Sequence, residues 1–570
     1  MPPSLSFLSS RWAATQAVAR HDVARILLIA ALHGAALALM AWSEVAIVPK
    51  VAFLLTWGLL NCFWLVLLRR PAVSAALSLA IIVLVILLSR FKYEMLWMTA
   101  SFVDVMIIDP DAVRFLLTII PGLYRDVAIA LALALPALAL LWWIDPFRVR
   151  FVTAAVGLVA CLGGIIGLVF AYPQNDWEAF YGDSFVSKFS RSGVAAISTL
   201  MTDGYMESDA TVTDRLRAVI GDETCRPAAK PPHIVMIHDE SSFDLRAVPG
   251  VTLPAGYGAH FRSFDGKQRG FIVEGAGGPS WYTEYNVLQG LSARSFGRFS
   301  YFVTRIAAGR VQRGLPQALR RCGYKTLSLY PALGAFMGAR SFQTSAGVDK
   351  FFDAKDLGAR EVEPDGFFYD QAAKLIAREK GQSPLFLFVY LSANHYPWNY
   401  RWRPDLAPDW RDLGNAPMVD EFLRRQAMSA RDYSAFLARL EREFPGESFL
   451  LVRFGDHQPD FAAAIIEPAL SEAERARRLQ TNDPRYFTTY YALDTINYRP
   501  KTIASALDTL EAPYLPLVVQ EAAGLPLDPS YAEQKRILER CHGTFYACAG
   551  GAEARRFNRL LIDAGLIQGF

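Results

Sequence analysis

The sequence has almost no net charge, +3 at pH 7 over 570 residues, and no basic stretch interleaved with aromatic residues. Proteins that bind nucleic acid concentrate lysine and arginine on one face, so the composition gives no argument for a nucleic-acid partner. Internal repeats and low-complexity tracts are also absent from the sequence. Apolar residues are abundant instead: they make up 52% of the chain, and most of the apolar runs lie before residue 172.

Five apolar segments are each long enough to cross a bilayer, which takes roughly 17 to 25 residues in a helix. They are 24–43, 51–68, 72–89, 126–144 and 151–171. The polar, basic segment RHDVAR precedes the first of them, and no small-residue cleavage site follows it. The first segment is therefore predicted to be a retained span rather than a cleaved signal peptide.

The positions of lysine and arginine predict the orientation in the membrane. Basic residues lie before the first span and in the second and fourth loops: Arg11, Arg20, Arg25, Arg69, Arg70, Arg148 and Arg150. The first loop has only Lys50, whereas the long third loop mixes both charges with two amphipathic segments, LWMTASFVDVMII and AVRFLLTII. We expect the N-terminus on the inner side of a cytoplasmic (inner) membrane. An odd number of spans then places everything after residue 172 outside, in the periplasm or its equivalent.

Three parts follow from this pattern. We predict a five-helix transmembrane domain at 1–172, a juxtamembrane connector at 173–231 and an exported domain at 232–570. The connector mixes polar and apolar residues, so it is predicted to lie along the membrane surface or to form a short packed helix.

Four of the six cysteines fall in the exported part, where disulfides can persist. Cys541 and Cys548 flank a short glycine-containing loop and are the expected pair, and Cys225 with Cys322 follows by elimination. A zinc site made from Cys541, His542 and Cys548 is the less favoured alternative, because a fourth ligand is missing nearby.

Short β-rich runs alternate with helical stretches from residue 232 onward. The predicted strands are 233–238, 325–331, 384–392 and 448–454, and the predicted helices are 281–292, 311–321, 367–380, 418–443, 502–523 and 530–540. Buried strands interleaved with helices argue for an α/β domain with a largely parallel sheet. In such sheets the chemistry collects at the carboxyl ends of the strands.

Three of the predicted strands end in unusual polar residues. The first leads into Glu240, the third into His395, and the fourth into RFGDHQPD, where Asp456 stands beside His457. Each has an ordinary structural alternative: an acid that caps a helix, a hydrogen-bonded histidine, or a polar loop after a core strand. Taken together, carboxylate oxygens and imidazole suit Mn²⁺, Mg²⁺ or Zn²⁺.

The segment EGAGGPSWYTEYNVLQGL adds a hydroxyl group. Its glycines let the backbone bend closely, and Ser280 opens a helical run. A hydroxyl at a helix N-terminus is well placed to bind or attack phosphate, because the free N–H groups and the helix dipole stabilise anions. The alternative is that Ser280 only caps this helix.

The segments IHDES, GGPSWYTEY, ANHYPW, GVDKFFD and FGDHQP, in this order, resemble one known family. This is the lipoteichoic-acid synthase and phosphoglycerol transferase branch of the alkaline phosphatase/sulfatase superfamily, which is related to membrane phosphoethanolamine transferases. The resemblance covers about residues 232–525 and implies a sulfatase-like catalytic fold. The five preceding spans also look like that family's membrane domain.

The resemblance also implies roles for individual residues. It makes Glu240, Asp456 and His457 ligands of one divalent ion. Ser280, where the family usually has threonine, becomes a further ligand and the nucleophile. His395 matches the histidine that contacts the substrate phosphate or assists the leaving group.

The sequence departs from the family pattern at two places. A Trp-x-Arg element before GVDKFFD is replaced by FMGARSF, so Arg340, the expected phosphate clamp, is displaced by one position. A substrate-binding histidine expected near Tyr330 is missing. Both departures bear on the identity of the transferred head group.

The expected function is metal-dependent transfer of a phospholipid head group, phosphoglycerol, onto an envelope glycan or glycolipid through a covalent phospho-serine. Phosphoethanolamine transfer by the same mechanism is the nearest alternative. A phosphodiesterase or sulfatase-type hydrolase is another, although no C/S-x-P-x-R sequence of the kind used to make formylglycine surrounds Ser280. A non-catalytic envelope sensor is disfavoured, because all four core positions keep competent side chains.

Overall fold

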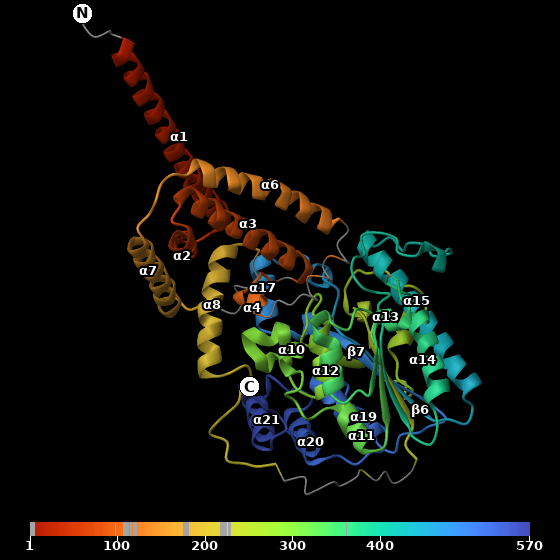
Figure 1. Ribbon diagram of the computed structural model, residues 1–570. Helices are drawn as coiled ribbons and strands as arrows, with labels where there is room; N and C mark the ends of the chain where they lie inside the picture. Colours follow the sequence, from red (N-terminus) through yellow and green to blue (C-terminus); the bar gives the residue numbers. More distant parts are fainter. Residues whose placement is uncertain are drawn as a thin grey trace, which may run out of the picture. The chain divides into compact units, whose positions relative to one another are not determined.

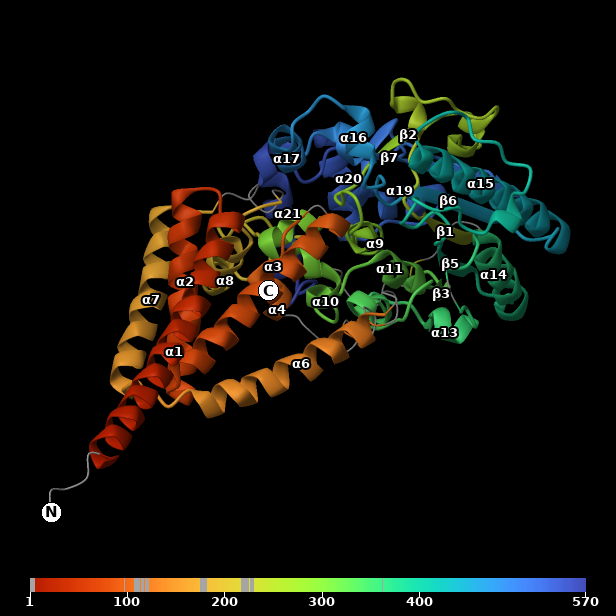
Figure 2. The ribbon, with the colours of Figure 1, turned by 90° about the horizontal axis from the view of Figure 1, so that it is seen from above.

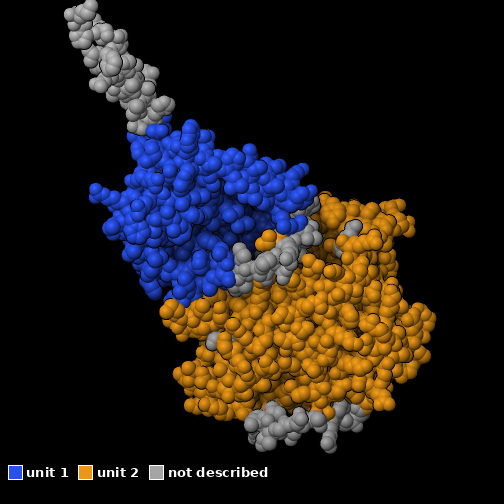
Figure 3. All heavy atoms as spheres, in the orientation of Figure 1, with its two compact units in different colours: residues 1–108, 116–198 blue, residues 109–115, 199–570 orange. Residues whose placement is uncertain are grey.

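The structure is a computed structural model, and it falls into two compact units. It describes residues 6–96, 98–106, 113, 117, 122–174, 182–216, 225, 230–360 and 362–569. The first unit comprises residues 1–108 and 116–198, and the second comprises residues 109–115 and 199–570 (Figure 3). Parts of the predicted amphipathic third-loop segments and of the connector lie outside the described residues.

The first unit is built from helices, most of them long and apolar (Figure 1). They are α1 (Ser6–Ser43), α2 (Ile47–Leu68), α3 (Pro71–Leu96), α4 (Phe102–Met106), α6 (Leu123–Ile144), α7 (Phe151–Ala171) and most of α8 (Phe185–Thr202). In the described part of the chain, five helices are long and apolar enough to cross a membrane: Val23–Ser43, Ile47–Leu68, Pro71–Glu94, Leu123–Ile144 and Phe151–Ala171. The five predicted spans are confirmed within a few residues, and the chain has the architecture of a multi-pass membrane protein.

Hydrogen bonds between loops show which ends of the spans lie together. Arg70, in the loop after α2, donates to the main-chain oxygen of Asp145, in the loop after α6. The carboxylate of Glu44, after α1, accepts from the main-chain N–H groups of Val186 and Ser187 at 3.2 and 3.4 Å, where α8 begins. The second and fourth loops thus share one side of the unit, and the first loop shares the other with the segment after the fifth span. This alternation is what five consecutive spans require.

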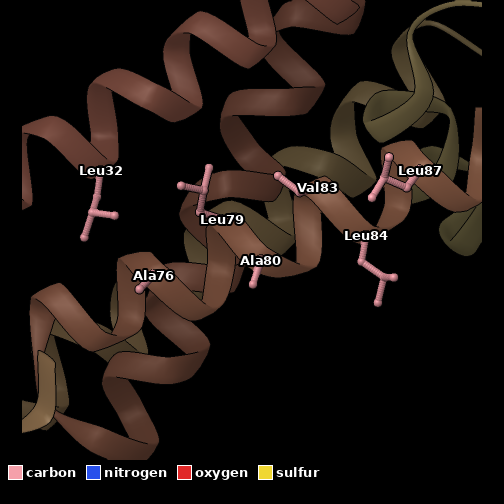
Figure 4. A pocket seen from close by; sticks show the side chains of 7 residues that line it. All are labelled: Leu32, Ala76, Leu79, Ala80, Val83, Leu84 and Leu87. Atoms are coloured by element: carbon pink, nitrogen blue, oxygen red, sulfur yellow. The ribbon is translucent and has the colours of Figure 1, made fainter. Parts of the chain in front are cut away.

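An open apolar groove of about 470 Å³ runs along α3 beside α1 (Figure 4). Its lining residues are Leu32, Ala76, Leu79, Ala80, Val83, Leu84 and Leu87. All of them lie within candidate membrane spans, so the groove is suited to contact with lipid hydrocarbon chains.

The second unit is an α/β domain around a mixed sheet (Figures 1 and 2). Its strands are β1 (His233–Asp239), β2 (Arg269–Ile272), β3 (Lys325–Leu329), β4 (Lys350–Phe352), β5 (Leu385–Tyr390), β6 (Phe449–Gly455), β7 (Thr488–Ile496) and β8 (Thr509–Glu511). Within the described residues they form one eight-stranded sheet in the order β4-β3-β5-β1-β6-β7-β2-β8. The strands from β4 to β6 are parallel, β7 is antiparallel to both neighbours, and β2 and β8 are parallel. The predicted largely parallel sheet is confirmed.

Helices cover both faces of this sheet. The described helices of this unit are α9 (Ser280–Gln289), α10 (Val303–Ala307), α11 (Leu315–Arg321), α12 (Ala339–Ser345), α13 (Ala354–Leu357), α14 (Asp365–Glu379), α15 (Pro417–Glu443), α16 (Ala462–Ile466), α17 (Glu472–Gln480), α18 (Pro484–Phe487), α19 (Leu515–Ala522), α20 (Pro529–Cys541) and α21 (Ala552–Asp563). Val235 and Ile237 of β1 pack with Phe368 of α14 and Phe436 of α15 in one buried core. Because alternate strand residues point to opposite faces, His238 points to the other face of the sheet, away from α14 and α15.

The predicted helix at 502–523 is wrong in its first half. Thr509–Glu511 is β8, and its Thr509 pairs with Gly270 of β2. The helix begins only at Leu515, after Pro513. β2, β4, β7 and β8 were not predicted, because these strands are short or polar and lack the continuous apolar run of a central strand.

Both predicted disulfides are present among the described cysteines. Cys225 is bonded to Cys322, and Cys541 is bonded to Cys548. The alternative zinc site is therefore wrong, since its two thiols are joined to each other.

Candidate active and metal site

The polar residues predicted at two strand ends and one helix start gather at the carboxyl edge of the sheet. Glu240 follows β1, and Asp456 and His457 follow β6. β1 and β6 are adjacent and parallel, so their carboxyl ends meet. Ser280 is the first residue of α9, and all four residues are buried.

The four side chains form one cluster. Oγ of Ser280 lies 3.1 Å from Nε2 of His457 and 3.4 Å from Oε2 of Glu240. The same Nε2 is 3.3 Å from Oδ2 of Asp456 and 3.5 Å from Oε1 of Glu240. The imidazole nitrogen of His457 is therefore in reach of the other three groups.

Main-chain contacts set which atoms face the cluster. Nδ1 of His457 lies 2.8 Å from the main-chain oxygen of Gln458. A ring nitrogen opposite a carbonyl carries the proton, so Nε2 presents its lone pair to the cluster. Oδ1 of Asp456 accepts from the main-chain N–H groups of Ser241 and His457 at 2.7 and 2.9 Å. Oδ2 of Asp456 is then the oxygen left for a ligand.

The turn after β6 depends on Gly455. A Cβ atom at this position would lie 1.8 Å from the main-chain oxygen of Ser242. Ser241, just after β1, has a φ of 51°, so the chain leaves β1 in a tight turn that brings Ser242 against Gly455. Because residue 455 has no side chain, the loop that carries Glu240 can contact the loop that carries Asp456.

The electrostatics of the cluster fit a divalent metal ion. Burial, and then the neighbouring charge of Asp456, raise the pKa of Glu240 well above its usual range. Oδ2 of Asp456 has no hydrogen-bond partner in the described chain. Two buried carboxylates close together are costly unless a cation balances them. Carboxylate, imidazole and hydroxyl donors are ligands that Mn²⁺, Mg²⁺ or Zn²⁺ accepts.

The motifs missed one member of this cluster, His238. Its Nε2 is 3.1 Å from Oδ2 of Asp456. Ligand atoms of His238, Glu240 and Asp456 all lie within 4.8 Å of one another. His238 lies on β1, two residues before Glu240, which follows the strand directly. Side chains two residues apart along a strand point to the same face, and this spacing is the signal that could have found His238.

Comparison with known proteins gives the family of one region of the chain. Residues 268–484 match the family model for sulfatases. This region is a sulfatase-family domain. The superfamily recognised from the motifs is thereby confirmed. Ser280, His395, Asp456 and His457 lie inside the matched region, whereas Glu240 comes before it.

Several solved structures are similar to the chain. The phosphoglycerol transferase GacH of Streptococcus pyogenes, in complex with sn-glycerol-1-phosphate, is 15% identical over 60% of this chain and 87% of its own, with a TM-score of 0.45. The lipoteichoic acid synthase LtaP of Listeria monocytogenes is 16% identical over 54% and 76%, with a TM-score of 0.39. The lipooligosaccharide phosphoethanolamine transferase EptA of Neisseria meningitidis is 13% identical over 83% and 95%, with a TM-score of 0.42. No curated protein matches the chain.

His395 of the sulfatase-family domain lies in the loop after β5, the strand on the other side of β1. Its ring is exposed, and its Nδ1 is 2.8 Å from the main-chain oxygen of Tyr396. Arg425, on α15, donates to the main-chain oxygen of His395 at 2.8 Å. His395 is thus held at the same edge of the sheet as the cluster, and its part in proton transfer stays a prediction.

Arg340 of the same domain is engaged in local ion pairs. Its guanidinium lies 2.8 Å from both Asp353 and Asp356, and it donates to the main-chain oxygen of Phe351 at 3.0 Å. Binding a substrate phosphate would require Arg340 to give up or share these contacts. Its predicted role as a phosphate clamp stays a prediction.

Proposed function

We propose that this protein transfers the head group of a phospholipid, phosphoglycerol, to an envelope glycan or glycolipid, and that Ser280 carries the group between two half-reactions. The observation that carries the proposal is the position of the Ser280 hydroxyl. It stands at the N-terminus of α9, 3.1 Å from His457 and 3.4 Å from Glu240. Free N–H groups at a helix N-terminus favour a phosphoryl group at this place.

The membrane helices support a lipid donor. Five helices of the described chain are long and apolar enough to span a bilayer. A protein anchored in this way meets a phospholipid without extracting it from the membrane, which would cost the burial of its acyl chains. The motif resemblance supports phosphoglycerol as the head group and a glycan or glycolipid as the acceptor.

Glu240, Asp456 and His457 would hold a divalent metal ion together with the hydroxyl of Ser280. Such an ion, when bound, lowers the pKa of an oxygen that it coordinates and offsets negative charge on a phosphoryl group. The carboxylate of Asp456 is already oriented for this by two main-chain N–H groups, and the ring of His457 by the carbonyl of Gln458.

The chain's own groups then account for bond making and proton transfer. Ser280 enters as the alkoxide, having released its proton to solvent. Its Oγ bonds to phosphorus while the bond to the diacylglycerol oxygen breaks, and His395 gives that oxygen a proton. In the second half-reaction His395 takes the proton of the acceptor hydroxyl, whose oxygen bonds to phosphorus while the bond to Ser280 breaks. Two half-reactions with a covalent intermediate predict ping-pong kinetics.

The test is mass spectrometry of the full-length protein after incubation with phosphatidylglycerol vesicles. We expect a phosphoglyceryl adduct on the peptide that contains Ser280, and none in Ser280→Ala. An adduct that forms only with phosphatidylethanolamine would assign the alternative donor. Acceptor modification by the Ser280→Ala variant would refute the covalent serine, and release of free glycerol phosphate without acceptor modification would assign a hydrolase.

A further inference from the structure

His238 is a buried histidine whose ring nitrogens lack partners. Its exposed fraction is 0%, and in the described chain neither Nδ1 nor Nε2 makes a hydrogen bond. The ring is stacked on Tyr390 with centroids 3.7 Å apart and meets the ring of Phe454 edge-on at 5.2 Å. Aromatic packing thus fixes the plane of the imidazole, while its polar atoms are left unsatisfied. Buried polar groups are rarely left so, and an unpaired one is often explained by an ion or water.

The neighbouring atoms indicate what the missing partner is. Nε2 of His238 is 3.1 Å from Oδ2 of Asp456, within ion-pair distance, but the two atoms do not meet the geometry of a well-formed hydrogen bond. Oδ2 of Asp456 has no other partner among the described residues. Nε2 of His457 stands 3.3 Å from the same oxygen. Oδ2 of Asp456 is therefore within ligand–ligand distance of both imidazoles, since ligands about 2.0–2.2 Å from a metal lie about 3 to 3.5 Å apart.

We propose that His238 is a direct nitrogen ligand of the metal at this site, and that the two imidazoles make the site select zinc over magnesium. The proposal rests on the proposed function in one respect, that this cluster is the metal site. It adds a residue that the motif resemblance does not place there. Imidazole suits zinc and similar transition metals, whereas Mg²⁺ prefers oxygen ligands and keeps several waters.

The position of His238 on β1 supports a direct bond over an indirect one. His238 and Glu240 are alternate residues of the strand and its exit, so both point to the face on which Ser280 lies. Asp239, between them, points to the opposite face, where its Oδ2 lies 3.0 Å from Nε2 of His260. An outer-sphere His238 would instead donate to Asp456 in a linear hydrogen bond, which the geometry does not show.

The experiment counts imidazole ligands. The full-length protein in detergent is stripped with a chelator and loaded with one equivalent of Cu²⁺, and pulsed EPR then counts the coordinated imidazoles. We expect two in the wild type and one in His238→Phe, a change that keeps an aromatic ring against Tyr390. The matched control is His233→Asn on the same strand, because Nδ1 of His233 already accepts from the N–H of Leu385 at 2.9 Å. This variant is expected to keep two. A single imidazole in the wild type overturns the proposal, whether or not the His238→Phe protein folds.

A second measurement tests selectivity and separates this proposal from the proposed function. Competition with a chromophoric chelator should show that His238→Phe lowers the zinc affinity by about 10- to 100-fold and changes the magnesium affinity much less. Equal losses for both metals, or wild-type protein that magnesium loads as well as zinc, would overturn the selectivity. Neither measurement uses lipid or acceptor. A transferase with one imidazole would therefore refute this inference alone, and two imidazoles without transfer would refute the proposed function alone.

Discussion

The contact between Gly455 and Ser242 leads to the first prediction, because it joins the two loops that carry the candidate metal ligands. We expect Gly455→Ala to push these loops apart. The new Cβ would lie 1.8 Å from the main-chain oxygen of Ser242, whereas real Cβ atoms essentially never come closer than 3.0 Å. The obstacle is backbone, so no side-chain rotation can relieve it.

The size of the effect follows from that distance. Restoring 3.0 Å from 1.8 Å requires a displacement of about 1.2 Å, shared between the exit of β1 and the end of β6. Glu240 and Asp456 are one or two residues from this contact, so their carboxylates move with it. Overpacking of this kind costs about 1–3 kcal/mol of folding free energy, and a misplacement of about 1 Å in a reacting group can cost about 100-fold in rate.

The assay compares Gly455→Ala with Gly446→Ala in the full-length protein. Gly446 lies in the turn before β6, and a Cβ there would meet nothing within 4 Å. The temperature of thermal unfolding, the zinc affinity and the transfer rate should all be lower in Gly455→Ala and close to the wild-type values in Gly446→Ala. Wild-type zinc affinity in Gly455→Ala would refute the reasoning, because it would show that the ligands do not depend on this contact.

Three further predictions concern the chemistry and its support. Ser280→Ala should abolish transfer yet keep the circular dichroism spectrum and thermal unfolding of the wild type; residual transfer would remove Ser280 from its role. A chelator should abolish transfer and a divalent ion restore it, with more of the ion needed at lower pH, because the raised pKa of Glu240 lets protons compete with the metal; indifference to chelation would contradict the metal site. Arg425→Met leaves the main-chain oxygen of His395 without its donor and removes one arginine from Glu421. Arg425→Met should lower the free energy of unfolding by about 2–5 kcal/mol and slow transfer, and Arg425→Lys should have an intermediate effect. An unchanged free energy of unfolding in Arg425→Met would contradict this supporting role of Arg425.

The spans and the central strands could be predicted from the sequence because the composition of each is stable in only one kind of environment. An apolar run such as 151–171 satisfies its backbone only as a helix and its side chains best in a bilayer. Central strands such as 384–392 are buried on both faces, so they appear as continuous apolar runs. These elements are defined by local composition, and β1, β3, β5 and β6 formed as predicted.

The edge of the sheet could not be predicted in the same way. Thr509–Glu511 is a strand because Thr509 pairs with Gly270, more than two hundred residues earlier in the chain. No local pattern records such a partner, and the flanking sequence favoured a helix. Pairing energy between distant segments outweighs weak local propensity in short elements of this kind.

The sequence by itself determined the membrane spans, the central strands and the identity of the polar residues at their ends. The tertiary structure decided which of those residues meet. It placed Ser280, Glu240, Asp456 and His457 in one cluster, added His238 to it, and paired Arg340 with Asp353 and Asp356 instead. The physical reason is that separations of about 3 Å between side chains are set by the adjacency of β1 and β6 and by the close approach at Gly455. Both are relations between segments far apart in the chain.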